Sequence, residues 1–142
     1  MKFSLSEISL ATTEPIQVVD ITERVKVSLD ESGISQGLLT LISNHTTAFI
    51  CVNEREIELQ RDMVEFLTRV APRGAGYRHD VHPVDDRQNA HAHLAGLFMN
   101  ASEGIPVTDG RLLLGDWQSI LFIELDGPRQ ARSVHVQIIG EP

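Results

Sequence analysis

The sequence contains only one cysteine, Cys51, among its 142 residues. A single cysteine excludes an intrachain disulfide and a zinc cluster built from several thiolates of the same subunit. Lysine and arginine together number 12 against 20 aspartates and glutamates, so the formal charge is -8. Because nucleic-acid binding depends on basic side chains that neutralise phosphates, we expect no nucleic-acid partner.

Long apolar segments are also lacking. No run approaches the roughly 20 apolar residues of a membrane span. The first residues, Met1 to Leu5, alternate apolar and polar side chains, unlike the continuous apolar segment of a secretory signal. The sequence therefore predicts a cytoplasmic protein without membrane contact.

The composition is that of an ordinary globular protein, with 42% hydrophobic and 23% charged residues. The length lies near the commonest size of one domain, so we expect a single domain over residues 1–142. Two stretches have helical periodicity and a third is rich in alanine and leucine, whereas β-branched and alternating apolar patterns predict strands elsewhere. The predicted helices cover residues 21–32, 57–70 and 89–99, and the predicted strands 2–10, 16–19, 37–42, 47–52, 105–107, 111–114, 119–125 and 132–139.

This order of segments lacks a repeated strand-helix-strand unit. In the last segment Val134, Val136 and Ile138 alternate with polar residues, which is typical of a strand with one buried face. The sequence therefore predicts an α+β fold, with a largely antiparallel β-sheet backed by two or three helices.

The segment from His79 to His93 concentrates the side chains that bind metals and move protons near neutral pH. It holds four of the six histidines and three aspartates. Its first part belongs to a polar stretch between Pro72 and Gln88, which is longer than most connections in a compact domain and is more often functional than idle. We expect a binding or catalytic site here, although solvated loop side chains would produce the same pattern.

Spacing distinguishes the histidines. Asn89 and His93 are four residues apart and share one face of a helix, whereas His91 lies about 200° from His93. We therefore expect His93 to face inward, with His79 approaching from the preceding loop and His45 from a strand edge. These three histidines could bind a divalent metal, Mg or Zn, or act in catalysis.

Other candidates flank the predicted strands. Asn53 and Glu54 end a buried strand, where a carboxylate can serve as general acid or base and an amide can bind a ligand. The only tryptophan, Trp117, precedes Gln118, and the pair could bind a ligand or fill a core or subunit contact. Asp86 is a further candidate, as a base or a helix cap. Arg129 and Arg132 flank the start of the last predicted strand, and each could bind a phosphate or pair with a surface carboxylate.

The ordered set of motifs resembles the YjbQ-like family, uncharacterised protein family 47, some members of which are named secondary thiamine-phosphate synthase. The chain departs from the family pattern at Asp116, where threonine is usual, and near Asn100, where glycine is usual. The matching residues run through almost the whole sequence: His45-Thr46-Thr47-Ala48, Asn53-Glu54, Asp62, His79-Asp80, Asn89-Ala90-His91-Ala92-His93-Leu94, Ser102, Ile105-Pro106-Val107, Gly110, Gly115-Asp116-Trp117-Gln118, Glu124 and Gly140-Glu141.

The resemblance implies a homotrimer of YjbQ-like α+β subunits, with a His/Glu/Asp pocket near the subunit contacts and Ser102 among the ligand-binding residues. It also implies a weak thiamine-phosphate synthase activity, which joins a pyrimidine pyrophosphate to a thiazole phosphate with release of pyrophosphate. The sequence thus favours a small enzyme that acts on a phosphorylated or other anionic small molecule, with His45, Glu54, His79, Asp86 and His93 as catalytic candidates. The alternative is a non-catalytic trimeric protein that binds a metal or another ligand.

Overall fold

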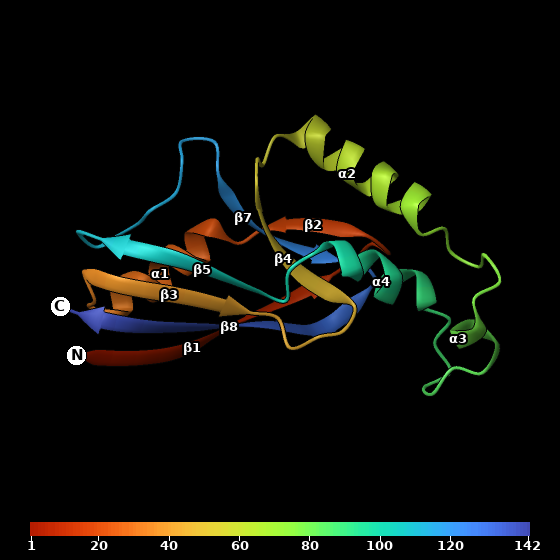
Figure 1. Cartoon of the computed structure of the whole chain (residues 1–142), viewed down its shortest axis with the longest axis horizontal. Coiled ribbons are helices and arrows are strands. Elements are labelled where there is room, and N and C mark those ends of the chain that lie inside the picture. The colour runs from red at the N-terminus through yellow and green to blue at the C-terminus, as the bar shows by residue number, and fades with distance from the viewer.

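Two antiparallel β-sheets form the frame of the structure, a computed structural model that describes residues 1–142 (Figure 1). The five-stranded sheet has the order β1-β8-β3-β5-β6, and the three-stranded sheet has the order β2-β7-β4. The strands are β1 (Lys2–Thr12), β2 (Gln17–Asp20), β3 (Gln36–Ile42), β4 (Ala48–Asn53), β5 (Ser102–Thr108), β6 (Arg111–Leu112), β7 (Ser119–Glu124) and β8 (Arg129–Glu141).

The helices are α1 (Thr22–Ser32), α2 (Ile57–Val70), α3 (Arg78–Val81), α4 (Ala90–Ala95) and the short 3-10 helix η1 (Gly96–Phe98). The predicted α+β fold with antiparallel strands is confirmed, but the strands divide between two sheets. The predicted loop after Pro72 contains α3, and the helix predicted over residues 89–99 is divided into α4 and η1. None of the helices is long and apolar enough to cross a membrane.

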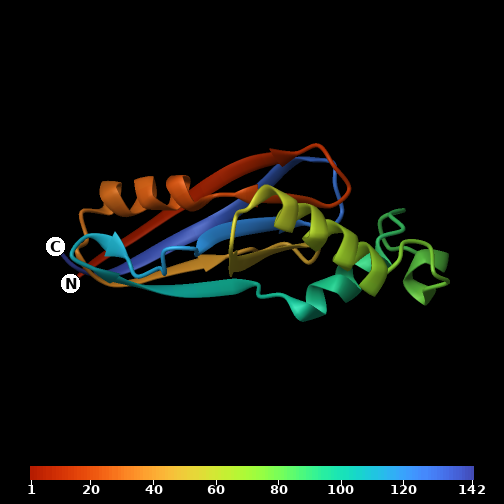
Figure 2. The same cartoon turned by 90° about the horizontal axis from the view of Figure 1, so that it is seen from above.

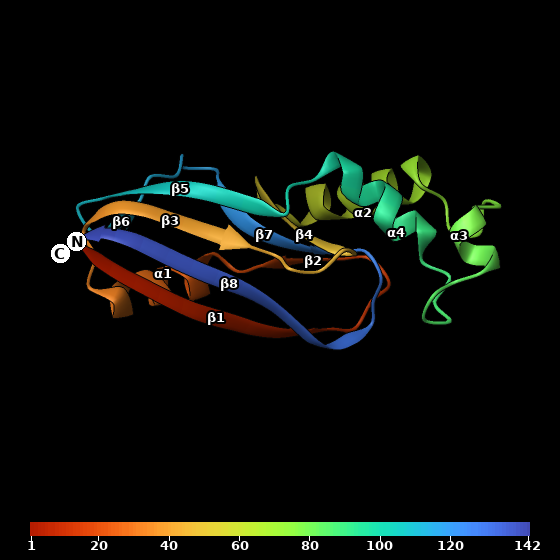
Figure 3. The same ribbon diagram turned by 60° about the horizontal axis from the view of Figure 1, so that its bottom comes forward.

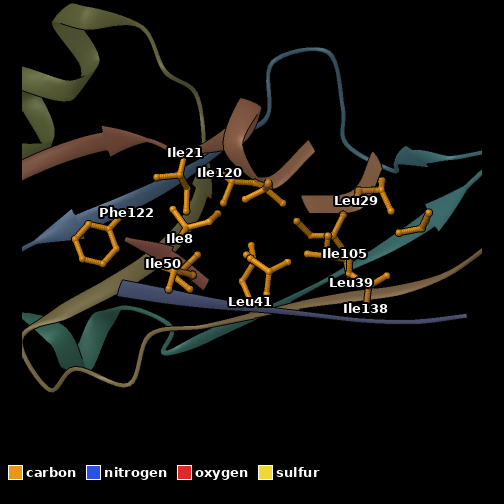
Figure 4. Packing of buried hydrophobic residues seen from close by; sticks show 14 of the residues in the cluster. Ile8, Ile21, Leu29, Leu39, Leu41, Ile50, Ile105, Ile120, Phe122 and Ile138 are labelled. Carbon is orange, nitrogen blue, oxygen red and sulfur yellow. The ribbon is translucent and has the colours of Figure 1, made fainter. Parts of the chain in front are cut away.

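The main core lies between the five-stranded sheet and the layer formed by α1, β4 and β7 (Figure 4). Strand β8 contributes Val134, Val136 and Ile138, so the alternation read from the sequence does mark its buried face. Helix α1 covers this face with Val25 and Leu29. Burial of these apolar side chains supplies most of the driving force for joining the two sheets.

Strand β7 is buried along its whole length. Ile120 and Phe122 face the main core, whereas Leu121 and Ile123 face a second apolar cluster with α2 and α4. A strand that is covered on both faces needs apolar residues at successive positions, which explains the continuous run from Ile120 to Ile123.

Helices α2, α3 and α4 gather at one end of the molecule, and both termini lie at the other end (Figures 2 and 3). The short helix η1, which directly follows α4, approaches β4 closely at its first residue, Gly96, where an added Cβ would overlap the ring of Phe49. This contact brings the histidine-rich segment against the ends of the sheets, where β3 joins β4 and β8 begins.

Candidate functional site

A polar pocket of about 420 Å³ opens where α3 and α4 meet the β3–β4 connection. Its wall is formed by residues 44–47, by His79 and His93, by Asn89, and by Arg129 and Arg132 from the start of β8. Val84 is the only hydrophobic residue among the eleven that line it. A lining with so many hydrogen-bonding groups suits a polar or charged ligand.

Arg132 is held in the pocket wall by a buried carboxylate. Its Nε and Nη2 donate to the two carboxylate oxygens of Glu124 at 2.8 and 2.6 Å, and Nη2 also donates to Thr47 Oγ1 at 2.9 Å. The Glu124 side chain is fully buried and that of Arg132 is 6% exposed. Burial by itself would raise the pKa of Glu124, but hydrogen bonds from Arg132, the Asp126 backbone N–H and Thr12 outweigh it and lower the pKa.

A second buried carboxylate, Asp126, holds two further arginines. Arg87 donates to it through Nε at 3.1 Å and Nη2 at 3.0 Å, and Arg129 donates through Nη2 at 2.7 Å. Asn89 Nδ2 donates a fourth hydrogen bond at 2.8 Å. Burial would raise the pKa of Asp126, but these hydrogen bonds together lower it from 3.8 to about 2.

The two buried ion-pair groups contain three arginines and two carboxylates, so together they carry one net positive charge, although the whole chain carries -8. The carboxylate of Asp85, which also lines the pocket, opposes this charge. Arg129 and Arg132 use Nε and Nη2 for their contacts within the protein, and their Nη1 atoms form no hydrogen bond within the chain. Because both guanidinium groups are fixed before a ligand arrives, an anion bound here orders no long side chain.

His45 lies against β8. The backbone N–H of Ser133 donates to His45 Nε2 at 3.0 Å. Burial lowers the pKa of His45, and the nearby positive charge of Arg132 lowers it further. The ring is therefore neutral at physiological pH, and its Nε2 lone pair is already engaged.

His79 is connected to the buried carboxylate through Asn89. Its Nε2 donates to Asn89 Oδ1 at 2.9 Å, while Asn89 Nδ2 donates to Asp126. Asn89 is 4% exposed and Asp126 7% exposed, so His79 is held by a hydrogen bond to a pair of buried residues. The rings of His79 and His93 meet edge to face, with centroids 5.1 Å apart and planes at 87°.

A second pocket of about 530 Å³ adjoins the first, since His79 and His93 line both. Its other walls include Tyr77, Ala90 and Leu94. The two histidines thus stand between a polar space and a more apolar one.

The structure brings five of the predicted site residues together, namely His45, His79, His93, Arg129 and Arg132. Asn89 and His93 line the same pocket, as their spacing predicts. His91, on another side of α4, is buried, and burial lowers its pKa.

The other predicted residues do not line this pocket within one chain. Asn53 is paired with Ser119 at the far end of β4, and its Oδ1 accepts a hydrogen bond from the backbone N–H of Glu54. Gln118 accepts from the N–H of Gly115 in a local turn. Trp117 is exposed, Ser102 begins β5, and Asp86 lines a separate polar pocket with Arg73 and Arg87. Their roles in catalysis or ligand binding stay predictions.

The residues of one chain do not fit the predicted three-histidine metal site. No group of three or more His, Cys, Asp or Glu side chains has the geometry to hold a metal ion. His45 has its Nε2 engaged by Ser133, and His79 uses its Nε2 to donate to Asn89. Binding of a divalent metal stays a prediction.

Three residues of the site were not singled out from the sequence as binding groups: Thr46, Thr47 and Asp126. The two threonines belong to the motif that begins at His45, and this motif was the only feature of the sequence that connected them with the site. Asp126 lies two residues after the end of the buried strand β7, and nothing in the neighbouring sequence indicates that its side chain is buried.

The family model of the UPF0047 protein YjbQ-like family matches residues 6–141. The chain belongs to this family. A UPF0047 protein of Methanothermobacter thermautotrophicus is 38% identical over 142 residues, which cover 100% of this chain and 96% of the relative. The UPF0047 protein YugU of Bacillus subtilis is 34% identical over 140 residues, with 96% of this chain and 99% of YugU covered.

Solved structures of the family have the same fold. A YbjQ-like protein of unknown function from Sulfolobus solfataricus superposes with a TM-score of 0.93 at 35% identity, over 99% of both chains. An uncharacterised YjbQ/UPF0047 protein from Clostridium acetobutylicum has a TM-score of 0.86 at 41% identity, over 94% of this chain and 99% of its own. The resemblance noted in the sequence is therefore confirmed for the family and its fold.

Proposed function

We propose that the polar pocket binds the phosphate or another anionic group of a small molecule. The observation that carries this proposal is the pair of arginines, Arg129 and Arg132, each fixed by a buried carboxylate with Nη1 free of partners in the chain. Thr46 and Thr47 add hydroxyl groups to the same wall. Arginine is well suited to this role because its planar guanidinium group matches the oxygens of a phosphate.

The uncharged part of the ligand would occupy the adjoining pocket. Tyr77 and Leu94 provide apolar surface there, and His79 and His93 separate it from the arginines. Together the two spaces have the size usual for small-ligand sites, and they combine an apolar wall with a few polar groups.

We expect wild-type protein to bind inorganic phosphate in isothermal titration calorimetry. Arg129→Gln should weaken binding about tenfold or more, because hydrogen bonds to charged groups contribute roughly 1.5 to 3 kcal/mol. Arg55→Gln is the matched control, since Arg55 is 67% exposed and pairs with Asp20 far from the pocket. Absence of phosphate binding at millimolar concentration would refute the anion site.

The catalytic part of the proposal is a weak thiamine-phosphate synthase activity, as the family resemblance implies. His93 lines both pockets and is therefore the histidine that we propose to act in this coupling. Glu54 would act only if a neighbouring subunit brought it to the pocket. The test is coupling of the pyrimidine pyrophosphate and thiazole phosphate with Mg²⁺, in wild type, His93→Ala and Glu54→Gln.

Loss of turnover in His93→Ala, with circular dichroism unchanged, would support a role in catalysis. Unchanged turnover in both folded variants would exclude His93 and Glu54 from the reaction.

The alternative is a trimeric ligand-binding protein without catalysis. It is favoured by the position of Glu54, which leaves the pocket of a single chain without this predicted acid or base. Phosphate binding without any turnover in the coupling assay would support this alternative. Elemental analysis of protein purified without a histidine tag would test whether its ligand includes a metal.

A further inference from the structure

His45 and His79 line the same pocket but have opposite hydrogen-bond partners at Nε2. At His45 the partner is the backbone N–H of Ser133, which can only donate, so Nε2 must carry a lone pair. A neutral imidazole has one proton, and at His45 this proton must therefore be on Nδ1. This is the opposite of the tautomer that an isolated histidine prefers.

At His79 the partner of Nε2 is Asn89 Oδ1, which can only accept. The orientation of the Asn89 amide is fixed because its other atom, Nδ2, donates to the Asp126 carboxylate at 2.8 Å. Nε2 of His79 must therefore carry the proton, which leaves the lone pair of the neutral ring on Nδ1. Neither Nδ1 forms a hydrogen bond within the chain.

We propose that these contacts give the two histidines different roles: His45 donates a hydrogen bond to the ligand through Nδ1, and His79 accepts one through Nδ1. Asn89, anchored by Asp126, is then a positioning residue for His79. The backbone of Ser133 has the same role for His45.

This division defines the ligand group more narrowly, and it rests on the proposed anion site. His45 requires an accepting oxygen, whereas His79 requires an O–H. Hydrogen phosphate carries both on one phosphorus atom. Sulfate has the same shape and charge but no proton, so it can satisfy His45 and the arginines but not His79.

The tautomers can be observed without any ligand or activity. Long-range ¹H–¹⁵N correlation spectra of the protein at mildly alkaline pH distinguish a protonated ring nitrogen from one with a lone pair. We expect a proton on Nδ1 of His45 and on Nε2 of His79. A proton on Nε2 of His45 in the wild-type protein would overturn the inference.

Asn89→Ala tests the positioning role, with His82→Ala as the control. Asn89→Ala removes the acceptor of His79 Nε2–H, so this proton should lose its protection from exchange, whereas His82→Ala should keep it. An equally protected Nε2 proton in Asn89→Ala would remove Asn89 from the proposal.

Binding of the two anions tests the functional consequence. At mildly alkaline pH, where both are dianions, wild-type protein should prefer phosphate over sulfate by roughly three- to tenfold, the contribution of one hydrogen bond. His79→Ala should lose this preference by weakening phosphate binding alone, whereas His45→Ala should weaken binding of both anions by similar factors. His82→Ala is the control, because His82 is an exposed histidine of the same segment that does not line the pocket.

The outcomes separate the two proposals. Failure to bind either anion would refute the anion site, while the spectra would still decide the tautomers. Binding of both anions with equal affinity would leave the anion site standing and overturn the role of His79.

Discussion

Glu124 and Asp126 are carboxylates in places where an isolated charge would be unstable. Each keeps its charge because several donors surround it: Arg132 and Thr12 at Glu124, and Arg87, Arg129 and Asn89 at Asp126. Buried ion pairs add little stability compared with apolar packing, but they hold their members in one geometry and are costly to break. At the scale of single residues, these contacts determine where the arginines of the pocket lie.

The pH dependence of Asp126 follows from its pKa of about 2, which lies below the ordinary value of 3.8. A lowered pKa stabilises the folded state at pH values above the ordinary value, and this contribution is lost as the pH falls from about 3.8 to about 2. It corresponds to about 2 kcal/mol. Asp126→Asn should therefore be less stable than wild type at neutral pH, and the difference should narrow in acid.

Urea denaturation at a series of pH values down to about 3 would measure this difference. Asp62→Asn is the control, because Asp62 is exposed on α2. A constant difference between wild type and Asp126→Asn across the whole pH range would contradict the assignment.

At the scale of elements, the strands β3 and β8 depend on a close approach of their backbones. Gly37 is paired with Gly140, and an added Cβ on Gly37 would overlap the carbonyl group of Ile139. Neither strand can move away without disturbing the core residues that β3 and β8 share. This part of the sheet therefore requires glycine for steric reasons.

Gly37→Ala should lower the free energy of unfolding by roughly 1 to 3 kcal/mol or more, the usual cost of overpacking. Gly104→Ala provides a matched control on the neighbouring strand β5. There the added Cβ would lie 3.8 Å from Leu38 Cδ1, an ordinary van der Waals contact. Chemical denaturation of both variants tests the difference, and equal stability would show that β8 can adjust.

At the scale of the whole molecule, the outer face of the five-stranded sheet carries an apolar row. Strand register aligns Phe3 with Ile139, Ile139 with Leu38, and Leu38 with Pro106. Phe3 is 65% and Leu38 48% exposed in the single chain. Exposed apolar groups that adjoin one another in this way are typical of protein contacts, and this row is our candidate for the subunit contact of the predicted homotrimer.

Leu38→Glu would place a charge in the middle of this row. If the row forms the subunit contact, light scattering should show a mass near three subunits for wild type and a smaller mass for the variant. Val27→Glu is the control, because Val27 is 53% exposed on α1, which covers the opposite face of the sheet. A wild-type monomer, or an unchanged trimer in Leu38→Glu, would contradict this role.

Local patterns in the sequence determined much of the fold. Alternation along β8 and helical spacing along α2 are properties of neighbouring residues, so they predict both elements, and the buried face of β8, without knowledge of the rest of the chain. The shared face of Asn89 and His93 was predictable for the same reason. The buried face of α2 was not predictable in this way, because its apolar residue Phe66 is 55% exposed. The division of the strands between two sheets was not predictable either, because local periodicity does not state which strands pair.

Only the tertiary structure decided how the site is assembled. Glu124 and Asp126 belong to an acidic sequence in which most carboxylates are solvated. These two are buried because the end of β7 packs against β8 and against the start of α4. The contact between Ser133 and His45 spans 88 positions in the chain. The sequence by itself therefore identified the histidine-rich segment and the family, whereas hydrogen bonds between distant segments determined the ring atoms that a ligand can reach.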